Sequence, residues 1–173
     1  MKKIKSFLIV IFSFMVLVTL VSLLMPSRVI TTHTVMVNSS YENVGHFLLD
    51  LSTWKEWHPL VQNQELSISV PSTGPYAYIE WVDGNKKNGI RVLRSAPDNI
   101  MFNNTRDGER AVINDIHINR FKGRNDLEVE WVAIHELKWY PWEKFSGMFL
   151  DKMTAPGYTL ALEQLKSAAE KHQ

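Results

Sequence analysis

Six short runs of alternating apolar and polar residues fill the middle of the chain, from Glu65 to Glu136, and turn signals separate each run from the next. This alternation places one side of an extended chain in a core and the other side in water, as in half-buried β-strands. The connections "PSTGP", "DGNKKN", "APD", "DGER" and "KGRN" have hairpin lengths, so neighbouring strands must run antiparallel. The pattern therefore predicts one antiparallel meander.

Elements of other kinds flank this meander. Before it, "RVITTHTVMV" alternates like an opening strand, and Ser39 and Glu42 stand at capping-box spacing before a helix expected from about Ser40 to Leu51. A short second helix or turn should follow and end at Pro59. After the meander, helical spacing returns, with a break or kink expected at the Pro156-Gly157 pair. The expected apolar face of this last helix consists of Phe145, Met148, Phe149, Met153, Leu160, Leu162 and Leu165.

The order of elements is thus one strand, two small helices, six strands and one long helix. This order predicts an α+β domain in which a curved antiparallel sheet of seven strands packs around a long C-terminal helix. Room for a ligand remains between the sheet and the helix if the central side chains do not fill it.

The N-terminal segment has the pattern of a membrane anchor. Lys2, Lys3 and Lys5 precede an uncharged run from Phe7 to Met25, which spans about 28 Å as a helix and so matches the apolar thickness of a bilayer. No small-residue cleavage site ends the run, which favours an uncleaved anchor over a removed signal peptide. We therefore expect residues 1–26 to form a single-pass anchor with a cytoplasmic N-terminus, and residues 27–173 to form one extracytoplasmic domain, periplasmic in a Gram-negative cell.

Composition excludes several classes of function. Three of the nineteen basic residues precede the apolar run, which leaves sixteen basic residues against eighteen acidic ones in the rest of the chain. This balance, without a cluster of basic residues, argues against nucleic acid as a partner. The chain has no cysteine, which excludes disulfides, thiolate nucleophiles and cysteine-bound metals. Its six histidines show no metal-ligand spacing, and no sequence feature requires a cofactor.

Four stretches, taken in order, resemble a known family. They are "MPSRV" after the apolar segment, "LLDLSTWKEWHPL", "YIEWVDG", and "LEQLK" near the C-terminus. On these stretches the chain resembles the START-like, or SRPBCC, helix-grip superfamily, and in particular its polyketide cyclase/dehydrase and lipid transport family. The resemblance implies a seven-stranded sheet that grips the C-terminal helix around an elongated apolar cavity, and hence a hydrophobic small molecule or lipid as ligand. It does not imply cyclisation, because one fold serves many functions.

The stretch "LSTWKEWHPL" has two possible roles. Trp54, Trp57 and His58 could form the rim of a ligand cavity, with the imidazole supplying a hydrogen bond. Alternatively, they form a corner that seals the small helices against the sheet. We expect the two tryptophans to seal the corner and His58 to lie nearer the mouth of the cavity.

Strand alternation places further polar side chains on apolar faces. Trp131 and His135 share one face of the last strand, as Asn104 and Arg106 share one face of an earlier strand. A buried polar group needs a partner, which a ligand, another side chain or water can supply, unless it lies exposed at the end of a strand. The candidate ligand-binding residues are therefore His58, Trp81, Asn104, Arg106, Asn114, Trp131 and His135.

Catalysis has less support in the sequence than binding. The chain lacks a nucleophile-elbow motif, and "IHELKW" lacks the second histidine of a zinc-binding helix. Two alternatives stay open. One is a cyclase or dehydratase that uses His135 or His58 with a nearby acid, because neighbours in space need not be neighbours in sequence. The other is an interaction module whose cavity is closed. The aromatic stretch "YPWEKF" could touch a bilayer surface or could simply pack where the last helix begins.

Overall fold

The computed structural model describes residues 2–124 and 126–171, which fall into two compact units. The smaller unit holds the chain up to Val29 together with Glu136–Met153, and the larger holds Ile30–His135 and the chain from Thr154 onward. The elements, in chain order, are α1 (Lys2–Leu23), β1 (Arg28–Val37), α2 (Tyr41–Leu49), a 3₁₀ turn (Leu51–Thr53), α3 (Trp54–Trp57), β2 (Ser67–Ile68), β3 (Tyr78–Asp83), β4 (Lys86–Ala96), β5 (Asn99–Arg106), β6 (Val112–Arg120), β7 (Leu127–Glu136), α4 (Pro141–Gly147) and α5 (Leu150–Lys171).

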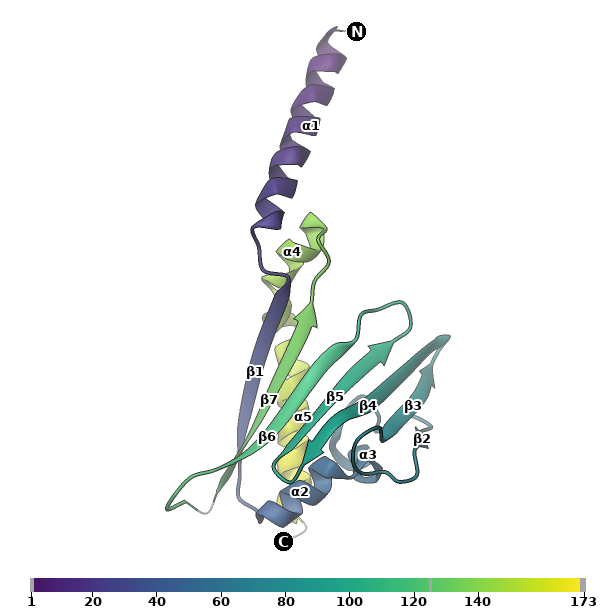
Figure 1. The fold of residues 1–173 in the computed structure, drawn as a ribbon, viewed down its shortest axis with the longest axis vertical. Helices are drawn as coiled ribbons and strands as arrows, with labels where there is room; N and C mark the ends of the chain where they lie inside the picture. Colours follow the sequence, from purple (N-terminus) through teal and green to yellow (C-terminus); the bar gives the residue numbers. More distant parts are fainter. Residues whose placement is uncertain (1, 125, 172–173) are drawn as a thin grey trace. The chain divides into compact units, whose positions relative to one another are not determined.

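The sheet has seven strands in the order β1-β7-β6-β5-β4-β3-β2. From β2 to β7 each strand pairs antiparallel with the next, so the meander and the α+β fold predicted from the sequence are confirmed. The sheet curves around α5, as Figure 1 shows. The first meander strand is shorter than its sequence run, because only Ser67 and Ile68 pair with β3.

Burial alternates along the strands as the sequence predicts. Leu127, Val129, Trp131 and Ala133 are buried on one face of β7, and the residues between them are half-buried. On β6 the buried face carries Asn114, Ile116 and Ile118. These inward faces meet the inner face of α5, so the core lies between the sheet and the helices.

The cap of α2 differs from the predicted capping box. Ser40 is the cap, and its Oγ accepts a hydrogen bond from the backbone N–H of Asn43 at 3.2 Å. Ser39 is buried and instead donates its hydroxyl to the carbonyl of Ala169 on α5, at 2.9 Å. The proximity of α5 therefore decides which serine caps the helix.

The last helix has no break at Pro156, and part of its expected apolar face is exposed. Pro156 lies inside α5 and does not break it, because a single proline removes one hydrogen bond while the rest of the helix still packs on the sheet. Five residues expected on the apolar face are exposed instead, namely Phe145, Met148, Phe149, Met153 and Leu160. The buried residues of α5 are Ala161, Leu162, Leu165 and Ala169.

The smaller unit contains the apolar helix. Within α1, residues Ile4–Leu23 have a mean hydropathy of 2.7, and almost none of them is buried. This length and composition suit a membrane span and suit a signal sequence equally well. The buried Lys144 of α4 donates hydrogen bonds from Nζ to the carbonyl of Met25 and the hydroxyl of Ser27, which join α4 to the segment that follows α1.

Candidate functional site

Both tryptophans of the opening corner are completely buried. Trp54 Nε1 donates to the carbonyl of Leu48 at 3.1 Å, and Trp57 Nε1 donates to the carbonyl of Phe47 at 2.9 Å. Each indole therefore buries its ring and also satisfies its only polar group on the end of α2. Their rings also contact Phe102 of β5 and Trp131 of β7, so the two tryptophans seal the small helices against the sheet, as the sequence predicts.

His58 lies deeper than the cavity mouth at which it was expected. Only 3% of this residue is exposed, and its ring stacks on Trp54 with centroids 5.1 Å apart and planes 5° apart. Burial lowers the pKa of His58 to about 3, so the imidazole is neutral at physiological pH. Trp54 and Trp57 both pack against it, and this packing is why it belongs to the interior.

Aromatic rings continue from this corner to α5. The ring of His58 lies 5.7 Å from that of Trp131 on β7, and Trp131 in turn lies 5.1 Å from Tyr158 on α5 in an edge-to-face contact. Phe102 of β5 touches both Trp54 and Trp131. The inner surface between the sheet and α5 is therefore aromatic from His58 to Tyr158.

A polar group of three side chains lies at the far end of this aromatic series. The hydroxyl of Tyr158 stands 3.5 Å from Nε2 of His135, and the ring of His33 stacks on that of Tyr158 at 5.2 Å. Burial raises the pKa of Tyr158 to about 12 and lowers the pKa of His135. Both side chains are therefore neutral near pH 7 and can offer hydrogen bonds without charge.

Two buried polar atoms in this region lack partners. Among the described residues, Nδ1 of His58 and Oγ1 of Thr31 are buried without a hydrogen-bond partner. Thr31 lies on β1, two residues before His33, and therefore on the same face of the strand. Unpaired buried groups cost free energy, and a bound ligand is one way to satisfy them.

Asn114 finds its partners within the protein. Its Oδ1 accepts a hydrogen bond from Nε1 of Trp131 at 2.9 Å, and its Nδ2 donates to the carbonyl of Val112 at 3.1 Å. The sequence left open whether a ligand, water or another side chain pairs with Asn114, and the structure shows that protein groups do. Asn114 therefore orients the indole of Trp131.

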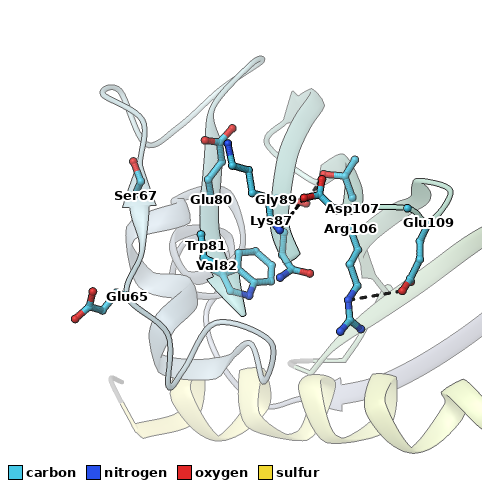
Figure 2. A pocket seen from close by; sticks show the side chains of 13 residues that line it. Glu65, Ser67, Glu80, Trp81, Val82, Lys87, Gly89, Arg106, Asp107 and Glu109 are labelled. Atoms are coloured by element: carbon cyan, nitrogen blue, oxygen red, sulfur yellow. Dashed lines mark hydrogen bonds and ion pairs between the residues drawn. The ribbon is translucent and has the colours of Figure 1, made fainter. Parts of the chain in front are cut away.

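Trp81 and Arg106 lie elsewhere, in an open pocket of about 730 Å³ near the β3–β4 and β5–β6 turns. Figure 2 shows both side chains on the same side of the sheet, with Glu80 and Asp107 on the other side. The guanidinium of Arg106 lies 3.6 Å from Glu109 and 4.0 Å from Asp83, so surface carboxylates already neutralise it. Many lining residues are charged, which makes this pocket a poor match for an apolar ligand.

The seven predicted residues thus form two groups. His58, Asn114, Trp131 and His135 belong to the aromatic interior, whereas Trp81 and Arg106 line the open pocket. Asn104 lies between the groups on β5, half-buried and paired in the sheet with Ile90 and Val112.

Sequence reasoning missed Tyr158 and His33 as members of the interior group. Tyr158 precedes Leu162 by four residues and Leu165 by seven, so helical periodicity could have placed it on the inner face of α5. His33 lies on β1, and nothing in its local sequence indicates a partner on α5.

Comparison with family models gave no match, and comparison with curated proteins gave none either. Solved structures do match. A norcoclaurine synthase of Thalictrum flavum superposes with a TM-score of 0.62 at 11% identity, over 84% of this chain and 96% of that one. An uncharacterized protein of Bacillus thuringiensis gives 0.59 at 12% identity, over 81% and 98%. DynU16, from the dynemicin biosynthetic locus, gives 0.57 at 15% identity, over 83% and 48%.

These likenesses define the class of the protein by its fold. A seven-stranded antiparallel sheet around a long C-terminal helix is the helix-grip architecture, and the matched structures share it over most of this chain. The helix-grip fold implied by the sequence resemblance is therefore confirmed. Identities of this size carry no function from one protein to another.

Proposed function

We propose that residues 27–173 form a binding domain for a hydrophobic small molecule or lipid, tethered to a membrane by residues 1–26. Within the helix-grip superfamily, the proposal places the chain in the polyketide cyclase/dehydrase and lipid transport family. The ligand would lie between the concave face of the sheet and α5, against the aromatic series from His58 to Tyr158.

One observation carries this proposal: the inward face combines aromatic rings with polar groups that are neutral and incompletely paired. Nδ1 of His58 and Oγ1 of Thr31 lack partners among the described residues, while Tyr158 and His135 meet at the long distance of 3.5 Å. A largely apolar ligand with one or two neutral polar atoms would complete these hydrogen bonds without bringing charge into the interior. Burial favours the neutral form of both His58 and His135, so neither would supply a positive charge to an anionic head group.

The test is to identify what copurifies with the protein. We would purify the full chain in mild detergent, extract it with organic solvent, and identify bound compounds by mass spectrometry. Tyr158→Phe removes the hydroxyl that faces His135 and keeps the ring, so it should reduce the amount of bound compound. Tyr76→Phe is the matched control, because Tyr76 is 77% exposed. Equal amounts of one compound in all three proteins would contradict a role for the Tyr158 hydroxyl, and extracts without any specific compound would contradict the binding function.

A second candidate function is catalysis of the cyclase or dehydratase type in the same interior. The contact between Tyr158 and His135 favours it, because a phenol and an imidazole in contact can relay a proton. Norcoclaurine synthase, a solved structure with this fold, is an enzyme. The phenol of Tyr158, which contacts His135, would serve as the acid of this mechanism. Conversion of the extracted compound by added protein would establish catalysis, and its unchanged recovery would favour binding alone.

The proposed topology has its own test. Lys2, Lys3 and Lys5 precede the span, and the positive-inside rule keeps such residues in the cytoplasm. A reporter that is active only outside the cytoplasm, fused after Gln173, should therefore be active. An inactive but well-expressed fusion would reverse the orientation, and probing the membrane fraction for the intact chain shows whether the anchor is retained.

A further inference from the structure

A cluster of exposed apolar side chains occupies α4 and its flanks in the smaller unit. We call it the apolar band, and its residues range from 39% exposure at Phe145 to 72% at Met153. The members are Trp139, Trp142, Phe145, Met148, Phe149 and Met153. Soluble surfaces rarely gather so many large apolar side chains in so short a segment, so the band calls for a partner.

The apolar band lies beside the end of the apolar helix. Lys144 of α4 donates to the carbonyl of Met25 at 3.2 Å and to the hydroxyl of Ser27 at 2.6 Å, and the backbone N–H of Leu137 donates to the carbonyl of Ser27 at 2.8 Å. Figure 1 shows α4 next to the C-terminal end of α1. Whatever surrounds the end of α1 must therefore also meet α4.

The charges in this segment do not oppose burial in an apolar phase. Between Leu137 and Leu150 the charged residues are Lys138, Glu143 and Lys144. Lys138 and Glu143 form an ion pair at 3.8 Å, and the side chain of Lys144 is buried against backbone and hydroxyl oxygens. From Trp139 to Phe149 the band therefore exposes aromatic rings and methionines while each charge has a partner, and Asp151 and Lys152, which are exposed, stand beside Met153 at its end.

We propose that the apolar band inserts into the interfacial layer of the bilayer that α1 enters, so that the lipid surface is its partner. Tryptophan is favoured at this depth, because its ring is apolar and its indole N–H can still reach water or head groups. The inference rests on the proposed membrane tether and adds a second contact with the same membrane. Such a contact would hold the segment from Glu136 to Met153 at the lipid surface, in addition to the attachment through α1.

The six tryptophans make a direct test possible, because α1 contains none. Trp54, Trp57 and Trp131 are at most 2% exposed and Trp81 is 7% exposed, whereas Trp139 and Trp142 are 61% and 66% exposed. Full-length protein would be reconstituted into phosphatidylcholine vesicles with or without brominated acyl chains, and quenching of tryptophan fluorescence would be measured. The test variant is Trp139→Phe with Trp142→Phe, which keeps two aromatic rings in the band, and Trp81→Phe is the control.

We expect brominated lipid to quench the wild type and the Trp81→Phe variant, and most of this quenching to disappear in the double variant. Alkaline carbonate extraction of the same vesicles shows whether α1 is inserted. Protein that resists extraction but shows equal quenching in the wild type and the double variant would overturn the lipid contact and leave the tether standing. Protein that carbonate releases would overturn the tether itself, and the inference with it.

Discussion

Replacing Trp57 with alanine should destabilise the larger unit more than any other single change considered for the corner. The side chain is completely buried and touches the rings of Trp54, His58 and Trp131. Its Nε1 also donates to the carbonyl of Phe47. The substitution therefore removes ring contacts on several sides and one hydrogen bond at the same time.

The magnitude follows from these two losses. Truncating a buried tryptophan to alanine costs about 3 to 5 kcal/mol, because the surroundings relax only partly into the cavity. The lost hydrogen bond adds about 1 kcal/mol, and no more, because the hydroxyl of Thr53 still donates to the same Phe47 carbonyl. The expected total of about 4 to 6 kcal/mol is a large fraction of the stability of most domains. In a domain of this size it should lower the melting temperature by roughly 10 to 20 °C.

Thermal unfolding of full-length protein in nonionic detergent, followed by circular dichroism, measures this shift. Trp142→Ala is the matched control, because it removes the same side chain from a position that is 66% exposed, and it should cost less than about 0.5 kcal/mol. Equal melting temperatures for Trp57→Ala and Trp142→Ala would refute the packing argument. A Trp57→Ala protein that kept its stability but lost its bound compound would place Trp57 in the ligand site instead.

Three further changes test other contacts. The folded-state pKa of His58, about 3, lies below its unfolded value of 6.5, so the free energy of unfolding falls as the pH drops from 6.5 toward 3. Between pH 7 and 5 the wild type should therefore lose about 2 kcal/mol more than the His58→Phe variant, as measured by urea unfolding. Asn114→Ala leaves Nε1 of Trp131 without its acceptor and should cost about 1 to 3 kcal/mol, whereas Asn119→Ala, which removes a surface contact with Glu128, should cost under about 1 kcal/mol. Lys144→Met should speed hydrogen exchange in residues 24–29 and 141–147, whereas the exposed control Lys152→Met should not. Equal exchange in both variants would show that the hydrogen bonds to Met25 and Ser27 do not hold α4 in place.

Most of the fold could be predicted because strand faces follow from a local rule. Side chains alternate along a strand, so the buried residues of β7 and the inward position of Asn114 on β6 can be read from sequence spacing alone. The errors concern features that depend on neighbours distant in sequence. Ser39 satisfies the capping pattern, but it turns to the carbonyl of Ala169, more than a hundred residues away, and Ser40 caps the helix instead.

The candidate site was harder to predict for the same reason. The contact between Tyr158 and His135 joins α5 to β7 and depends on which part of the helix lies opposite which strand, which periodicity does not supply. His58 was expected at a cavity mouth because a polar residue beside two tryptophans suggests a rim. Its backbone N–H instead bonds to the carbonyl of Trp54, which turns the imidazole back onto the indole and into the core.

Five of the six tryptophans of this chain separate into two groups with opposite physical roles. Trp54, Trp57 and Trp131 are buried, and the indole N–H of each donates to an acceptor inside the protein, so their contribution is to the stability of the grip. Trp139 and Trp142 expose most of their surface, so the protein gains little folding energy from their rings. Large apolar side chains that do not stabilise the fold still carry a solubility cost in water. That cost vanishes if a lipid surface covers these side chains. The exposed Trp139 and Trp142 are therefore evidence about the surroundings of the protein, whereas the three buried tryptophans are evidence about its interior.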